Sequence, residues 1–132
     1  MAGSSLFSIG LSGLAAAQRR LETAAGNIAN SASAGSEATA FRPQRTTTEA
    51  TPDGGVVART QAVSPPFVQL FAPDHPEAAA DGSVFFPNIS LARETVEIKT
   101  AEAGYKASAR LIETASELQD SLLDITDDDT RR

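Results

Sequence analysis

The chain has few residues with versatile chemistry, and its single histidine is the first candidate for a reactive group. His75 lies in the segment Pro73-Asp74-His75-Pro76, next to one acid, Asp74. General acid–base catalysis needs a second positioned group, and a zinc site needs three or four ligands at suitable spacing. One histidine and one acid between two prolines supply neither arrangement. We therefore interpret His75 as a loop residue.

The carboxylates are numerous, 17 Asp and Glu in all, but their spacing marks no catalytic or metal site. No two of them are singled out as a buried acid–base pair, and Asp74, Glu77 and Asp81 lack the alternation of a calcium-binding loop. The run 127–129 of three aspartates is more typical of a solvated tail. No glycine-rich segment follows a predicted strand and leads into Lys-Ser/Thr, as a phosphate-binding loop would. We expect no enzymatic activity and no cofactor or metal.

Length and composition predict one domain with a thin hydrophobic core. The chain has 132 residues, 5% of them aromatic, with no Trp and no Cys. Little apolar area is buried per residue in such a chain, so part of its stability is expected to come from partner chains. The absence of Cys excludes disulfides and thiolate metal sites.

The net charge of −6 is unevenly distributed. Residues 67–132 carry six Lys and Arg against thirteen Asp and Glu, whereas residues 1–66 are nearly balanced. Nucleic-acid binding needs a basic face, so we exclude that class of partner. The N-terminus lacks a basic segment followed by a continuous apolar run, and no apolar stretch reaches the roughly 20 residues of a membrane span. We expect no membrane insertion and no cleaved signal peptide.

Residues 1–33 are predicted to form a helix with one apolar seam. Its members recur at alternating spacings of four and three residues: Phe7, Leu11, Leu14, Gln18, Leu21, Ala25 and Ile28. This is the a/d pattern of a coiled coil with one polar member. Ser4 or Ser5 is expected to cap the start of the helix, and Asn27 or Asn30 to close its end in the left-handed conformation.

Three glycines lie between the first and last seam residues of this helix, at positions 10, 13 and 26. Each costs about 1 kcal/mol relative to Ala in a helix. We infer that the helix frays in isolation and is ordered by packing, with the glycines and the neighbouring alanines allowing another helix to come close.

Residues 34–88 change character and contain all seven prolines. Residues 41–48 and 56–60 are predicted to be extended and paired across the Asp53-Gly54 turn. Residues 67–71 and 84–86 are further strand candidates, with a second turn at Ala80–Ser83. We expect a small, irregular β region with long loops.

Residues 89–126 are predicted to form the second helix, because Pro is absent there and Gly occurs once. Its apolar seam steps sideways along the helix and comprises Ile98, Tyr105, Ile112, Leu111, Ala115, Leu118, Leu122 and Ile125. The acids of this helix, including Glu94 and Glu97, are assigned to a solvated face. Residues 127–132 are expected to form a tail, because Asp127–Asp129 would oppose the helix macrodipole.

Together these features predict a mainly α fold, in which the N- and C-terminal helices form a coiled-coil-like pair beside the small β region. The β region is too slight to cover both seams, so the helices must pair with each other or with neighbouring subunits. A structural subunit that assembles through its ends satisfies this pattern. A soluble helical adaptor that binds a partner's amphipathic helix is the alternative from another class.

Several motifs resemble those of flagellar axial proteins. The segments Leu6–Leu14 and Ala24–Ser31, with Asn27 and Asn30, resemble their N-terminal signature. Phe86-Pro87-Asn88-Ile89 followed by Ala103–Ala107 is similar to their C-terminal signature. Within that family, Ala72–Pro76 and Ala80–Val84 are similar to basal-body rod proteins of the FlgC type, which form the proximal rod, and segment 73–88 argues against the FlgB type.

One departure concerns the residues that follow Asn30. Ser31-Ala32-Ser33 replaces the Thr-x-Gly-Tyr continuation common among axial proteins, and Phe41-Arg42 comes only after an insertion. FlgC-type chains usually carry such an insertion, so the departure favours this subtype.

The resemblance implies where the protein works and with what. The two helices would pack into an inner tubular rod layer around a central channel, with the middle region facing outward. Copies of the chain would assemble with other rod proteins and adjacent basal-body components in the periplasmic space. Subunits would leave the cell interior unfolded through the flagellar type III export apparatus. The assembled rod would transmit torque.

Overall fold

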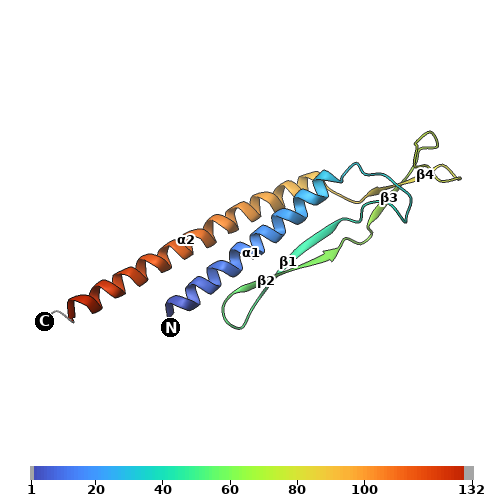
Figure 1. The fold of residues 1–132 in the computed structure, drawn as a ribbon. Coiled ribbons are helices and arrows are strands. Elements are labelled where there is room, and N and C mark those ends of the chain that lie inside the picture. The colour runs from blue at the N-terminus through green and yellow to red at the C-terminus, as the bar shows by residue number, and fades with distance from the viewer. Residues whose placement is uncertain (1, 130–132) are drawn as a thin grey trace.

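Two long antiparallel helices give the molecule its elongated shape (Figure 1). The computed structural model describes residues 2–129, with side chains described for residues 6–126. Helix α1 spans Ala2–Ala29 and helix α2 spans Leu91–Asp129, and both chain ends lie at the same end of the molecule. The four strands are β1 (Gln44–Ala50), β2 (Val56–Ala62), β3 (Phe67–Phe71) and β4 (Ser83–Pro87). The predicted fold of two terminal helices around a small β region is confirmed.

The helices approach closely because small residues line their contact. A Cβ atom at Gly10 would lie 2.5 Å from Ile112 Cγ1, and one at Gly13 would overlap the Ser108 side chain. Farther along, Gly104 faces the methyl group of Ala17. Ala17, Ala24, Ala101 and Ala115 are buried. The predicted role of the glycines in close helix approach is therefore confirmed for Gly10 and Gly13, whereas a Cβ at Gly26 would meet nothing within 4 Å.

The helix ends differ from the sequence-based expectations. Helix α1 begins at Ala2, so Ser4 and Ser5 lie inside it and not at its cap. Within residues 2–129 only glycines have positive φ, so neither Asn27 nor Asn30 is left-handed. Helix α2 continues through Asp127–Asp129, contrary to the predicted end at 126, because no Pro or Gly follows Gly104 and terminal acids cost only about 0.3–1 kcal/mol each. The final residues 130–132 of the predicted tail lie outside the described residues.

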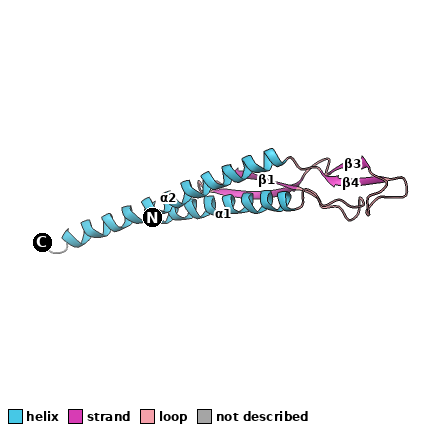
Figure 2. Cartoon of the chain, turned by 90° about the horizontal axis from the view of Figure 1, so that it is seen from above, coloured by secondary structure: helices cyan, strands magenta, loops and turns pink. Residues whose placement is uncertain are grey.

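Strands β1 and β2 form an antiparallel hairpin that lies along α1, as Figures 1 and 2 show. Gln44 pairs with Ala62 and Ala50 with Val56. The connecting turn has Gly54 at φ 84°, a conformation that suits Gly, and Thr51 N–H donates to the Gly55 carbonyl at 2.8 Å. The predicted pairing across Asp53-Gly54 is confirmed.

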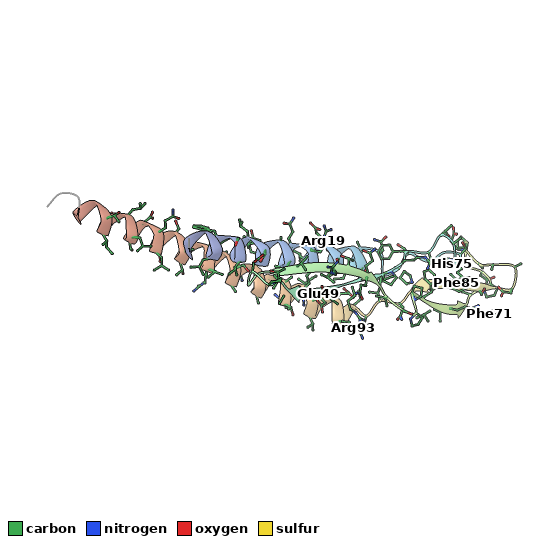
Figure 3. All side chains as sticks on the ribbon, turned by 90° about the horizontal axis from the view of Figure 1, so that it is seen from below. Arg19, Glu49, Phe71, His75, Phe85 and Arg93 are labelled. Atoms are coloured by element: carbon green, nitrogen blue, oxygen red, sulfur yellow. The ribbon has the colours of Figure 1, made fainter. Side chains whose placement is uncertain are left out.

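Strands β3 and β4 form a second antiparallel hairpin at the end of the molecule farthest from the termini (Figure 1). Gly35 extends this hairpin through two backbone hydrogen bonds with Phe85. Phe67 packs edge-to-face on Phe85 at 6.0 Å between ring centroids, and the Arg42 guanidinium lies over Phe67. Phe71, by contrast, points away from this cluster and is 78% exposed (Figure 3).

Candidate assembly surface

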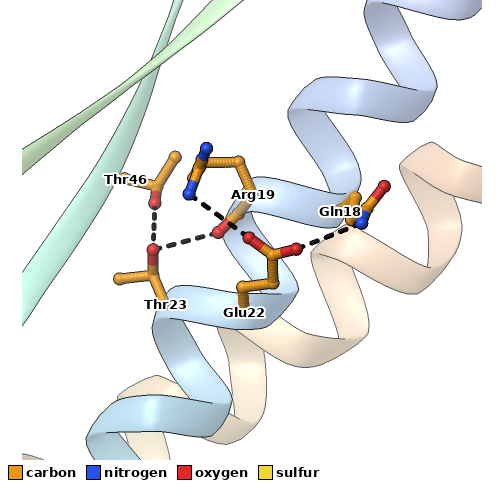
Figure 4. Close-up of polar contacts among 5 residues, drawn as sticks. All are labelled: Gln18, Arg19, Glu22, Thr23 and Thr46. Carbon is orange, nitrogen blue, oxygen red and sulfur yellow. Dashed lines mark hydrogen bonds and ion pairs between the residues drawn. The ribbon is translucent and has the colours of Figure 1, made fainter.

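Polar side chains on one face of α1 hold the first hairpin in place. Ser12 Oγ accepts from Val56 N–H at 3.1 Å and donates to the Ile9 carbonyl. Thr46 Oγ1 donates to Thr23 Oγ1 at 2.8 Å, and Thr23 in turn donates to the Arg19 carbonyl (Figure 4). Sequence patterns did not single out Ser12 or Thr23, because isolated hydroxyls in a helix carry no signal of their partner.

The four residues identified by family motif all fix chain geometry. Asn27 is 2% exposed; its Nδ2 donates to the Gln44 carbonyl and its Oδ1 accepts from Gln44 N–H. Asn30 Nδ2 donates to the Gly26 carbonyl at the end of α1, which satisfies one of the unpaired terminal carbonyls. Pro87 is buried, and Asn88 bonds the carbonyls of Pro65 and Pro66 just before α2 starts.

The prediction that the acids of α2 lie on a solvated face is only partly correct. Glu97 forms an ion pair with Arg20 of α1 at 3.1 Å, with side chains 30% and 21% exposed. Glu94 is buried in the first turn of α2, near the positive end of the helix dipole. Both acids lie where α1 and α2 are adjacent, and tertiary packing encloses them.

The predicted apolar seam of α1 is mostly left uncovered by the single chain. Phe7, Leu14 and Ile28 are half-buried, whereas Leu11 is 59% exposed and Leu21 and Ala25 are also exposed. The apolar residues that α1 buries are the small ones, Ala16, Ala17 and Ala24. The seam is thus rotated relative to the contact between the two helices. Glycine and alanine allow α2 and the hairpin to approach α1 on faces that carry few large apolar residues.

On α2 the predicted seam divides into a covered part and an uncovered part. Ala115 is buried, and Ile98, Leu111 and Ile112 are half-buried. Four members are exposed in the single chain: Tyr105, Leu118, Leu122 and Ile125. These residues were predicted to pack against a helix, and within one chain 52–66% of each residue is left exposed.

The uncovered part of α2 extends past the start of α1 (Figure 1). Gly10 lies against Ile112 and the helices are antiparallel, so Ala2 is level with about residue 120. We call residues 116–129, which begin about one turn before this extension, the α2 overhang. Its apolar side chains include Leu122, 65% exposed, and Ile125, 66% exposed, and it carries six acids and no base. The end of α2 therefore exposes apolar side chains beside a cluster of acids.

A groove of about 640 Å³ runs between α1 and α2. Its walls are mainly apolar, with polar groups at the rim; the lining residues are Ala17, Gln18, Leu21, Ile98, Ala101, Glu102, Tyr105 and Lys106. At the rim, Glu102 accepts from Lys106 at 2.7 Å and from Lys99 at 3.2 Å. These two hydrogen bonds, first that of Lys106, lower the pKa of Glu102 below its ordinary value of 4.5.

No reactive constellation emerges from the tertiary structure of the described residues. His75 accepts a hydrogen bond from Glu77 N–H on Nδ1 and packs edge-to-face on Phe86. Within residues 2–129, no three His, Cys, Asp or Glu side chains gather where they could hold a metal ion. No helix in the same part of the chain is long and apolar enough to span a membrane.

Comparison with known proteins identifies a family of similar chains. Residues 7–34 match the family model of the flagella basal body rod protein. The chain is 32% identical over 125 residues to the flagellar basal-body rod protein FlgC of Salmonella typhimurium, covering 89% of this chain and 93% of that one. FlgC of Salmonella typhi is equally similar over the same span. The chain belongs to the family of flagellar basal-body rod proteins of the FlgC type.

Proposed function

We propose that this chain is a structural subunit of the proximal rod of the flagellar basal body. In this role it polymerises through α1 and α2 into a tube that surrounds the export channel and transmits torque. Its partners are copies of itself, other rod proteins and adjacent basal-body components, in the periplasmic space. It reaches this place through the flagellar type III export apparatus.

The observation that carries the proposal is the exposed apolar stripe of α2. Leu118, Leu122 and Ile125 continue the face that packs on α1, yet they are 52%, 65% and 66% exposed in the single chain. Full burial of each such side chain contributes about 1.5–3 kcal/mol, so leaving three of them in water is costly unless a neighbouring subunit shields them. Subunit contacts along a tube supply that shield.

The arrangement of the remaining elements supports the same role. Both hairpins pack along α1 or beyond the helix ends, and α2 has one side free of them (Figure 2). A tube wall of side-by-side helices needs such a free side for the next subunit. The hairpins would then face outward from the tube.

A motility experiment tests this function. A strain that lacks the chain is complemented with Leu118→Asp, and swimming and the content of purified basal bodies are measured. We expect loss of both, because assembly would bury an unpaired charge. Ser116→Asp, two residues away and also exposed, is the matched control and should retain swimming. Normal swimming with Leu118→Asp, or normal swimming without the chain, would refute the proposal.

A further inference from the structure

The two outer edges of the second hairpin differ in how their backbone groups are paired. On the β4 edge, Phe85 exchanges two hydrogen bonds with Gly35, and the Ser83 carbonyl accepts from Ala79 N–H at 2.9 Å. Ala79 belongs to the loop between the two strands, so this loop folds along the β4 edge. Strand β3, in contrast, contacts no helix or strand other than β4 within residues 2–129.

The alternation of the ladder shows which backbone groups of β3 point away from β4. In an antiparallel pair, residues that exchange hydrogen bonds with the partner strand alternate with residues that do not. Phe85 uses both of its backbone groups for Gly35, so its cross-strand neighbour Gln69 lies in a pair without hydrogen bonds. The N–H and C=O groups of Gln69 therefore point outward, as do those of Phe67 and Phe71. Among residues 2–129, these groups have no backbone partner.

Strand β3 lacks the features that usually keep an exposed edge from pairing with another chain. Such edges commonly carry a charged side chain, a Pro or a bulge. The sequence Phe67-Val68-Gln69-Leu70-Phe71 has no charge and no Pro, and its register with β4 is continuous. Val68, Leu70 and Phe71 are 45%, 51% and 78% exposed. The β3 edge is thus open to a further strand.

The sequence of β3 is complementary to itself in the antiparallel direction. When two copies of β3 pair around Gln69, the aromatic residues Phe67 and Phe71 lie opposite each other at both ends. Val68 then lies opposite Leu70, and the two Gln69 amides lie side by side. Cross-strand pairs of this kind stabilise a sheet, and no like charges are opposed. The same register sets the outward backbone groups of 67, 69 and 71 opposite one another, so each pair can exchange two hydrogen bonds.

We propose that the free chain forms a two-fold dimer in which β3 pairs antiparallel with β3 of a second copy, centred on Gln69. The resulting sheet has the order β4-β3-β3-β4. Its outer edges are the two β4 edges, which Gly35 and Ala79 already cover, so pairing stops at two chains. The hairpin lies beyond the helix ends, where a second copy can approach (Figure 1). A closed two-fold pair cannot extend, so this contact belongs to the chain before assembly and differs from the proposed rod contact through α2.

Disulfide trapping tests the register, because the chain contains no Cys. In Gln69→Cys the Cα atoms of the two cysteines would lie about 5.5 Å apart, which suits a disulfide. The matched control is Gln61→Cys, which also replaces an exposed Gln on a strand, in the first hairpin. The purified full chain is oxidised at about 1 mM, since so small a contact binds weakly.

Covalent dimer is then measured by electrophoresis under denaturing, non-reducing conditions. We expect at least about tenfold more covalent dimer from position 69 than from position 61, given the distance limit of a disulfide. Equal yields from the two variants, or no covalent dimer from Gln69→Cys, would overturn the proposed register.

A proline at the centre of β3 tests the backbone contact without breaking the hairpin. Gln69→Pro removes an N–H that points outward, whereas the bonds to β4 use residues 68 and 70. In sedimentation equilibrium, the mass of the wild-type chain should rise with concentration toward that of a dimer. Gln69→Pro should stay monomeric with an unchanged circular dichroism spectrum.

Leu118→Asp separates this contact from association through α2. It disrupts the proposed rod contact and should still dimerise as the wild type does. Dimerisation that is lost in Leu118→Asp and kept in Gln69→Pro would place the association on α2 and reject the β3 contact, with the rod function left standing. A wild-type chain that stays monomeric at about 1 mM would also reject the dimer.

Discussion

Asn27 of α1 binds both backbone groups of Gln44, at the first residue of β1. Its Nδ2 donates to the Gln44 carbonyl at 2.7 Å, and its Oδ1 accepts from Gln44 N–H at 3.1 Å. The amide thus imitates a neighbouring strand and sets where the first hairpin starts along α1. The family motif marks Asn27 only as a characteristic residue. The structure gives it a defined role, which is to fix the start of the first hairpin.

Replacing this residue should loosen the hairpin. Asn27→Ala is expected to lower the free energy of unfolding by about 1–3 kcal/mol, because two partly buried backbone groups of Gln44 lose their partner. Urea denaturation followed by circular dichroism measures the loss. Gln44→Ala is the control: the hydrogen bonds use its backbone and its side chain is exposed, so a loss as large as that of Asn27→Ala would contradict this account.

The glycines of α1 should respond in opposite ways to substitution. Gly10→Leu is expected to destabilise the helix pair by about 1–3 kcal/mol through overpacking against Ile112, although leucine favours helix formation. Gly26→Ala meets no atom within 4 Å and should stabilise by up to about 1 kcal/mol. Thermal unfolding of both variants provides the comparison, and a stabilised Gly10→Leu would show that the helices are not in close contact there.

The ion pair between the helices should contribute a small, measurable coupling. Arg20 and Glu97 are partly exposed, so we expect about 1 kcal/mol or less between them. A double-mutant cycle with Arg20→Met and Glu97→Gln isolates this value by denaturation. Additive effects of the two substitutions would mean that the pair does not form in solution.

The titration of Glu102 should depend on Lys106. The carboxylate accepts hydrogen bonds from Lys106 and Lys99, which favour its ionised form, so its pKa is lowered from 4.5. A group with a lowered pKa stabilises the fold at pH above its unfolded value, and this contribution disappears as the pH falls through the folded value. Carboxyl NMR should find the midpoint below 4.5 in the native chain and closer to 4.5 in Lys106→Met. An unchanged midpoint would exclude the Lys106 bond as its cause.

The overhang should be the least protected part of α2 in isolated subunits. Leu118, Leu122 and Ile125 of the overhang are 52%, 65% and 66% exposed, whereas Ala101 and Ala115 are buried. Amide hydrogen exchange should therefore be fast in the overhang of the free chain and slow between residues 97 and 112. In assembled rods the overhang should become protected. Equal protection of both segments in a monodisperse monomer would favour the helical adaptor considered from the sequence.

Hydrophobic periodicity and turn chemistry determined much of the architecture. A Pro-free stretch with one Gly predicts a long second helix, and Asp53-Gly54 predicts the first hairpin, because both signals are local and depend on backbone preferences. The motifs around Asn27, Asn30, Pro87 and Asn88 likewise identify the family from the chain alone. The predicted end of α2 at residue 126 was wrong, because the weak repulsion between Asp127–Asp129 and the helix dipole does not break a helix.

Only the tertiary structure decided which faces of the helices meet. Hydrophobic periodicity reflects mainly large apolar residues, so it predicts a seam that contains Leu11 and Leu21, whereas the helices of one chain meet at Gly10, Gly13 and Ala17. Small residues carry little hydrophobic signal but permit the closest approach, and the choice between the two faces depends on how both helices and the hairpin fit together. For the same reason the ion pair of Glu97 and the uncovered overhang were visible only once α1 and α2 were set side by side.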